Sequence, residues 1–142
     1  MSKLLAITGI TGKSGFSFAE VLAQNYSAVE KLFPGGIRVL VRSGSNTAKL
    51  DNILPKAEKI KGSLKDKDYI KKSFEGVDTI IHIAGIHLSE EIVNAAVINR
   101  VRRMILVHTT GVYSKYKAAG EEYRRIDDYV YETCRKNNIT LT

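Results

Sequence analysis

Short apolar runs alternate along this chain with longer segments in which apolar residues recur every three or four positions. The runs at 4–7, 37–41, 57–61, 79–84 and 104–107 predict five strands. The first run is apolar without alternation, which is typical of a strand buried on both faces of a parallel sheet. Helical spacing predicts helices at 16–26, 46–53, 66–76, 88–100 and 117–138, and residues 139–142 have the composition of a sixth strand.

This alternation predicts an α/β fold built on a doubly wound parallel sheet. Strands joined through helices run parallel, and right-handed crossovers give the order 3-2-1-4-5, followed by the start of a sixth strand. The 142 residues are the length of one domain, and neither a low-complexity linker nor a repeat larger than the strand–helix unit divides them. We therefore expect one domain, 1–142.

Three glycines, Gly9, Gly12 and Gly15, separate the first strand from the first helix. Glycine lets a backbone turn tightly and lets a pyrophosphate approach closely, and the first N–H groups of a helix attract anions. The segment is not a Walker loop, because Ile7 stands where that pattern needs a glycine. We predict that this turn binds a dinucleotide and is not purely structural. The predicted binding residues are Gly9, Thr11, Gly12, Lys13, Ser14 and Gly15.

The end of the second strand indicates which dinucleotide is preferred. An acidic residue there holds the ribose 2′-OH of NAD, whereas arginine accommodates the 2′-phosphate of NADP. Arg42 and Ser43 follow the strand, and no Asp or Glu occurs between Arg38 and Lys49. We predict a preference for NADP(H), with NAD(H) left open as a second cofactor; the alternative is that Arg42 is only a solvent-facing strand end.

With these features, the sequence resembles the extended or atypical short-chain dehydrogenase/reductase family, in its NmrA-like, NAD(P)-binding branch. The resemblance covers essentially the whole chain. It rests on TGITGKSG at 8–15, VLVR at 39–42, GVD at 76–78 with IHIAG at 81–85, and RMILVHTTGVY at 103–113. It implies a Rossmann fold, with Ala84 and Gly85 beside the ribose. Ser63 stands where the family has an aspartate that contacts adenine, and Thr109 stands at the position of the catalytic Ser or Thr.

The catalytic Tyr-x-x-x-Lys pair of that family is poorly matched. Alignment of the last helix places Tyr123 at the tyrosine, but Asp127 then replaces the lysine, and a carboxylate raises a tyrosine pKa instead of lowering it. Tyr113 and Lys117 have the right spacing, yet they follow the fifth strand, where the family has a non-catalytic tyrosine. The catalytic candidates are therefore Thr109, Tyr113, Lys117 and Tyr123.

Composition narrows the class of protein further. The net charge of +7 is dispersed without a basic run, so we expect no nucleic-acid partner. No apolar run reaches the length of a membrane span, and the single cysteine, Cys134, fits a reducing cytoplasm and a place in the core. The three histidines lack metal-ligand spacing on one element, so we propose no metal; His82 and His108 are expected to be satisfied within the sheet.

Together these observations predict a cytoplasmic NADP(H)-binding domain with weak or no turnover as the chain stands. The family builds its substrate pocket beyond the sixth strand, and that part is expected to be absent here. Two alternatives remain open: a non-catalytic NADP(H)-sensing or protein-binding module, and a fragment of an active NADP-dependent oxidoreductase or epimerase. The small-molecule substrate is unknown, and a homo-oligomer is left open.

Overall fold

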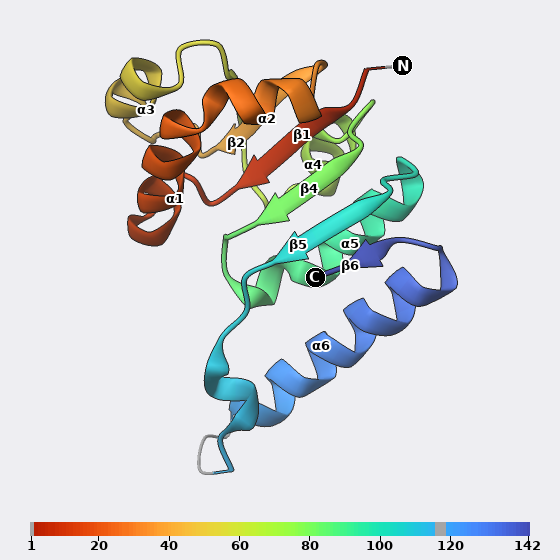
Figure 1. Ribbon diagram of the computed structural model, residues 1–142. Helices are drawn as coiled ribbons and strands as arrows, with labels where there is room; N and C mark the ends of the chain where they lie inside the picture. The colour runs from red at the N-terminus through yellow and green to blue at the C-terminus, as the bar shows by residue number, and fades with distance from the viewer. Residues whose placement is uncertain (1, 116–118) are drawn as a thin grey trace.

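The described residues, 2–115 and 119–142 of the computed structural model, form a six-stranded parallel sheet between two layers of helices (Figure 1). The strands are β1 (Leu4–Thr8), β2 (Gly36–Val41), β3 (Glu58–Lys61), β4 (Thr79–His82), β5 (Arg103–Leu106) and β6 (Thr140–Leu141). Their order is β3-β2-β1-β4-β5-β6, which confirms the predicted order 3-2-1-4-5 and the predicted sixth strand, which pairs with β5. The central strand β1 is almost wholly buried, as its unbroken apolar run predicts.

The helices divide between the two faces of the sheet. One face carries α1 (Lys13–Gln24), α2 (Tyr26–Leu32) and α3 (Ala48–Ile53), and the other carries α4 (Lys67–Ser73), α5 (Ser89–Ile98) and α6 (Ala119–Lys136). Two short 3-10 helices, η1 (Ile86–Leu88) and η2 (Thr110–Tyr113), follow β4 and β5. This is the doubly wound α/β arrangement that the alternating pattern predicts.

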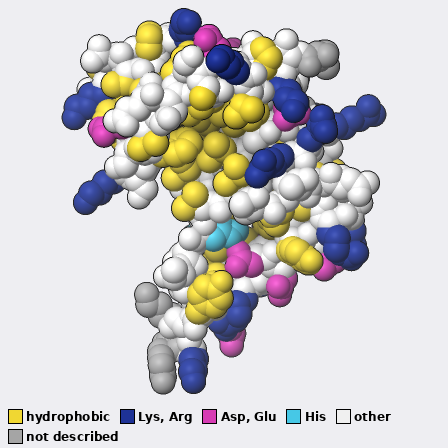
Figure 2. Space-filling view, viewed as in Figure 1, with side chains coloured by type: hydrophobic (Ala, Val, Ile, Leu, Met, Phe, Trp, Pro, Cys, Tyr) yellow, Lys and Arg dark blue, Asp and Glu magenta, His cyan; other side chains and the backbone are white. Residues whose placement is uncertain are grey.

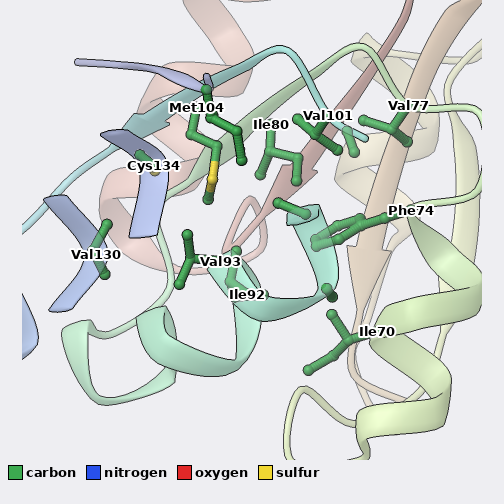
Figure 3. Close-up of a cluster of buried hydrophobic side chains, with 14 of the residues drawn as sticks. Ile70, Phe74, Val77, Ile80, Ile92, Val93, Val101, Met104, Val130 and Cys134 are labelled. Atoms are coloured by element: carbon green, nitrogen blue, oxygen red, sulfur yellow. The ribbon is translucent and has the colours of Figure 1, made fainter. Parts of the chain in front are cut away.

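Each face has its own hydrophobic core. Between the sheet and α4–α6, Ile80 and Met104 pack with Ile92, Val130 and Cys134, and this cluster is shown in Figure 3. The second core joins β1 and β2 to α1 and α3. Burial raises the pKa of the Cys134 thiol to about 11, so the cysteine is a packing residue, as its helical spacing indicates.

Helix α4 has a polar residue at its start and a glycine after its end. Asp66 caps α4, because its carboxylate accepts hydrogen bonds from the N–H groups of Asp68 and Tyr69. Gly76 follows that helix with a φ of +76°, a conformation that favours glycine.

The structure differs from the predicted elements most clearly at α1 and α2; in addition, η1 and η2 were not predicted, and β4 ends two residues before the predicted end at 84. Helix α1 begins at Lys13, three residues before the predicted start at 16, so the last part of the glycine segment forms its first turn. Helix α2 was not predicted, because none of its residues is buried and no strong apolar periodicity marks it. The earlier start of α1 matters for the site, since it moves the helix N-terminus to Gly12.

Candidate functional site

A cleft of about 510 Å³ opens at the carboxyl ends of the strands, beside the start of α1. This is the edge at which doubly wound sheets bind their ligands. It is lined by Gly9, Thr11, Gly12, Lys13, Ser14, Gly15, Arg42, Ser63, Leu64, Lys65, Ile83, Ala84 and Leu88. The cleft therefore joins the ends of β1, β2, β3 and β4, which are far apart in the sequence.

The three glycines have different steric roles. Gly9 has a φ of +76°, and a Cβ there would lie 2.8 Å from the carbonyl carbon of Ile83, so β1 and β4 can come together only at a glycine. A Cβ on Gly15 would overlap the carbonyl oxygen of Gly9 and lie 2.7 Å from the Cα of Ile10. Gly12, in contrast, has an ordinary extended conformation, and the nearest atom to its Cβ position is 3.4 Å away. The packing of the protein thus requires Gly9 and Gly15, whereas Gly12 has room for a Cβ at ordinary contact distance.

The N-terminus of α1 is suited to bind a negatively charged group. Gly12 is its N-cap residue, no side chain in the described part of the chain caps the helix, and no acidic residue lies in its first turn. The first N–H groups of such a helix need an acceptor, and the helix dipole favours an anion there. Placed against the cleft, this helix end can accept a phosphate group.

Three cationic side chains line the same cleft: Lys13, Arg42 and Lys65. Among the described residues, none of the three takes part in an ion pair, and no Asp or Glu lines the cleft. Their charges are therefore not neutralised by the protein, and the cleft attracts polyanionic ligands.

Of the predicted cofactor-binding residues, nine line the cleft, whereas Ser43 and Gly85 do not. Ser43 is exposed, and Gly85 lies at the start of η1 with open space around its Cβ position. Sequence reasoning missed Leu64, Lys65, Ile83 and Leu88. Lys65 was detectable in principle, since it follows the end of the third strand and its charge suits a phosphate-rich ligand.

Of the four catalytic candidates, the three that the structure describes, Thr109, Tyr113 and Tyr123, do not line the cleft. The Thr109 hydroxyl accepts a hydrogen bond from the N–H of Gly111, 3.1 Å away, and caps η2. Tyr123 reaches the same glycine, since a Cβ there would lie 3.0 Å from its ring, and this ring lies 5.5 Å from that of His87. Tyr113 is 86% exposed, and Lys117 lies outside the described residues. The structure thus brings Thr109 and Tyr123 near each other, while Tyr113 points into solvent.

Asp127 does not act on Tyr123. Its carboxylate pairs with Nδ1 of His108, whose Nε2 lies 2.7 Å from the Ser89 hydroxyl. The expectation that the sheet satisfies His108 is wrong, because β5 ends at Leu106 and the partners of His108 come from α5 and α6. The atoms follow the order of a Ser-His-Asp triad, but Ser89 is fully buried and cannot meet an external substrate. This chain of hydrogen bonds joins the segment after β5 to α5 and α6.

His82 lies within the sheet, as expected, but only one of its nitrogens is partnered there. Its Nδ1 lies 2.6 Å from the Thr8 hydroxyl on β1, and its buried Nε2 has no hydrogen-bond partner in the described part of the chain. Burial lowers the pKa of His82 to about 4, and the backbone of Gly85 offsets only part of this effect. The imidazole is therefore neutral at pH 7.

The described residues include no group of three or more His, Cys, Asp or Glu side chains placed to hold a metal ion. Nor does any helix among them have the length and apolar character needed to cross a bilayer.

Comparison with known proteins provides independent information. The model of the NAD(P)H-binding family matches residues 11–137. An uncharacterized protein of Saccharomyces cerevisiae, YLL056C, is 35% identical over 78 residues, which are 55% of this chain and 24% of that protein.

Two solved structures extend the comparison to the fold. Pen from Bacillus thuringiensis superposes with a TM-score of 0.75 at 19% identity, over 99% of this chain and 48% of its own. DesIV, a dTDP-glucose 4,6-dehydratase from Streptomyces venezuelae solved with NAD bound, has a TM-score of 0.75 at 19% identity, over 97% of this chain and 53% of its own. The chain thus spans about half the length of these two proteins.

Proposed function

Because this chain belongs to the NAD(P)H-binding family and has the Rossmann fold of atypical short-chain dehydrogenases/reductases, we propose that it binds NADP(H) in the cleft at the start of α1. The observation that carries the proposal is the combination found there: a helix end with no side-chain cap, a glycine at position 12 that packing does not require, and three cations that form no ion pair within 2–115 and 119–142. Such a surface suits a ligand that carries several phosphate groups.

Each part of the cleft has a distinct role in this proposal. The N–H groups at the start of α1, with Lys13 and Ser14, hold the pyrophosphate, and Gly12 allows it to approach the backbone. Arg42 holds the 2′-phosphate, for which its planar guanidinium is well shaped. Ser63 and Lys65 lie on the side of the adenosine, and Ala84 lies beside the ribose.

The preference for NADP(H) rests on Arg42 and on the absence of any carboxylate among the residues that line the cleft in the described structure. The similar dehydratase was solved with NAD, so the shared fold by itself does not select a cofactor. In this proposal, the preference for NADP(H) over NAD(H) comes from the side chains at the end of β2.

We further propose that the chain as printed turns over little or no substrate. A bound NADPH supplies a hydride, but reduction also needs a placed proton donor. Asp127 is paired with His108 and offers no cation to Tyr123, while Tyr113 is exposed to solvent. Thr109, whose hydroxyl already caps η2, is left as the group that would orient a carbonyl.

Titration calorimetry with NADPH, NADP⁺, NADH and NAD⁺ tests the proposed function directly. We expect saturable one-to-one binding of the NADP forms and at least several-fold weaker binding of the NAD forms. If none of the four binds, the cleft is structural only and the proposal is wrong. If the two classes bind equally, dinucleotide binding stands and the role of Arg42 is refuted.

A further inference from the structure

The loop after β3 forms one wall of the cleft and is tied down by backbone hydrogen bonds. Ser63, Leu64 and Lys65 line the cleft. Just before them, the N–H of Gly62 donates to a carbonyl at the end of β2, at 2.9 Å. Just after them, the N–H of Asp66 donates to the carbonyl of Ser63, at 3.0 Å, and closes a tight turn. The loop therefore presents its side chains to the cleft from a defined backbone.

This wall lies on the side of the base in the proposed mode of binding. The strands stand in the order β3-β2-β1, so β3 is the neighbour of β2 on the side away from β1. With the pyrophosphate at the start of α1 and the 2′-phosphate at Arg42, the ribose lies near the end of β2. The base on that ribose then reaches the next strand end, where Leu64 offers an apolar surface and Ser63 and Lys65 offer polar groups.

The polar groups of this wall can donate more hydrogen bonds than they can accept. A hydroxyl has one donor and two acceptor sites, and the Ser63 hydroxyl already accepts the N–H of Lys65 at 3.2 Å. It keeps one donor and one acceptor, while the Lys65 ammonium only donates. The nearby carboxylate of Asp66 is occupied by the first N–H groups of α4. Among the described residues, no Asp or Glu lines the cleft.

The Lys65 ammonium is also free to meet a ligand. On the face shown in Figure 2, Lys and Arg side chains are dispersed, and several have Asp or Glu beside them. Near β2 and β3, Arg38 pairs with Glu58 and Lys59 pairs with Asp51. Within 2–115 and 119–142, Lys65 takes part in no such pair. Its donors are therefore not taken by a carboxylate of the protein.

We propose that this wall accepts hypoxanthine as readily as adenine, so that the deaminated form of NADP(H) is also a ligand; this inference rests on the proposed function. At the edge concerned, adenine has a 6-amino donor and an N1 acceptor, whereas hypoxanthine has a 6-oxo acceptor and an N1–H donor. Ser63 can pair with either arrangement, because its hydroxyl both donates and accepts. Lys65 can donate to the N1 of adenine or to the 6-oxo group, a purine acceptor to which lysine commonly donates.

Two other arrangements of the base edge fit less well. A carboxylate in this wall would select adenine, since it accepts from the 6-amino group and repels a 6-oxo group, but the described residues place none there. Guanine carries a 2-amino donor in addition to the edge of hypoxanthine, and that donor needs a further acceptor. The surplus of donors in this wall therefore favours hypoxanthine over guanine as the second base.

The test is titration calorimetry with NADPH and with reduced nicotinamide hypoxanthine dinucleotide phosphate. Both are titrated into the 142-residue chain and into Ser63→Asp, Lys65→Ala and Lys61→Ala. Ser63 and Lys65 are exposed, so these substitutions leave the hydrophobic cores unchanged. Lys61 is an exposed lysine at the end of β3 that does not line the cleft, so it is the matched control for the loss of one positive charge.

We expect the wild type to bind the two dinucleotides with affinities within about threefold of each other. Ser63→Asp should favour NADPH by about tenfold, the usual size of discrimination against a mismatched base edge. Lys65→Ala should weaken both dinucleotides by about threefold or more, and Lys61→Ala should change either affinity by less than about twofold.

The outcomes separate this inference from the proposed function. If the wild type binds neither dinucleotide, the proposed function is wrong and this inference falls with it. If NADPH binds and the hypoxanthine form is weaker by more than about threefold, only this inference is wrong. Equal affinities in Ser63→Asp, or equal losses in Lys65→Ala and Lys61→Ala, would show that the wall does not contact the base and would also overturn it.

Discussion

Replacement of Gly12 by valine separates the ligand-binding role of the glycine turn from its structural role. The φ of −73° and ψ of 173° at Gly12 are accessible to any residue, and the nearest atom to a Cβ there is 3.4 Å away. The loss of glycine, a favoured N-cap residue, lowers the stability by about 0.5–1 kcal/mol. The lower conformational entropy of the unfolded chain with valine raises the stability by about the same amount. We therefore expect the free energy of unfolding to change by less than about 1 kcal/mol.

The same substitution should abolish dinucleotide binding. Gly12 lines the cleft at the first N–H groups of α1, where the pyrophosphate must approach the backbone. A branched side chain there keeps the phosphates from those donors, and loss of even one charge-assisted hydrogen bond costs about 1.5–3 kcal/mol, or about tenfold or more in affinity. Gly12→Ala, with one methyl group, should lie between valine and the wild type.

Gly15→Ala is the matched comparison, because this substitution should lower the stability of the fold itself. Its Cβ would overlap the carbonyl oxygen of Gly9, so the start of α1 must shift, at a cost of about 1–3 kcal/mol in stability. Urea denaturation and NADPH calorimetry on Gly12→Val, Gly12→Ala and Gly15→Ala give the two readouts. Normal NADPH affinity in a folded Gly12→Val would show that the turn is structural only, and the central inference from the sequence would be wrong.

Three further predictions use other residues. Arg42→Ala should remove most of the difference in affinity between NADP(H) and NAD(H), an effect above about tenfold at low salt, and calorimetry that shows an unchanged ratio would refute the assignment. The wild type should show no consumption of NADPH with quinones, aldehydes and ketones, or a background rate that the Tyr113→Phe/Tyr123→Phe double variant leaves unchanged. A wild-type turnover near about one per second that this variant abolishes would reveal an active site. His82 has a pKa of about 4 in the folded chain and an ordinary value of 6.5. Below pH 6.5 the unfolded state therefore binds more protons, and up to about 3 kcal/mol of stability should be lost as the pH falls from 6.5 to 4. Urea midpoints across this range should show a slope that is missing in His82→Leu.

The strand order and the cleft could be predicted because their determinants are local in the sequence. The apolar runs, the glycines after the first strand and Arg42 after the second each act within a few residues, and the topology of a parallel sheet then brings strand ends together. This is why nine of the predicted cofactor-binding residues line one cleft. Lys65 was missed because a single lysine in a short loop is also typical of a solvated surface, although its place after β3 and its charge were compatible with the cleft.

The sequence by itself determined the α/β class, the order of the strands and the place of the cleft, since periodicity and glycine spacing specify backbone conformation and burial. Only the tertiary structure decided which partner each polar side chain takes. Asp127 aligns with a catalytic lysine, yet it binds His108, which is 19 residues away in the sequence and is also held by Ser89. Only the structure could show that Ile81 of β4 packs against the core beside α1–α3 whereas Ile105 of β5 belongs to neither core, because the two strands are similarly apolar in the sequence.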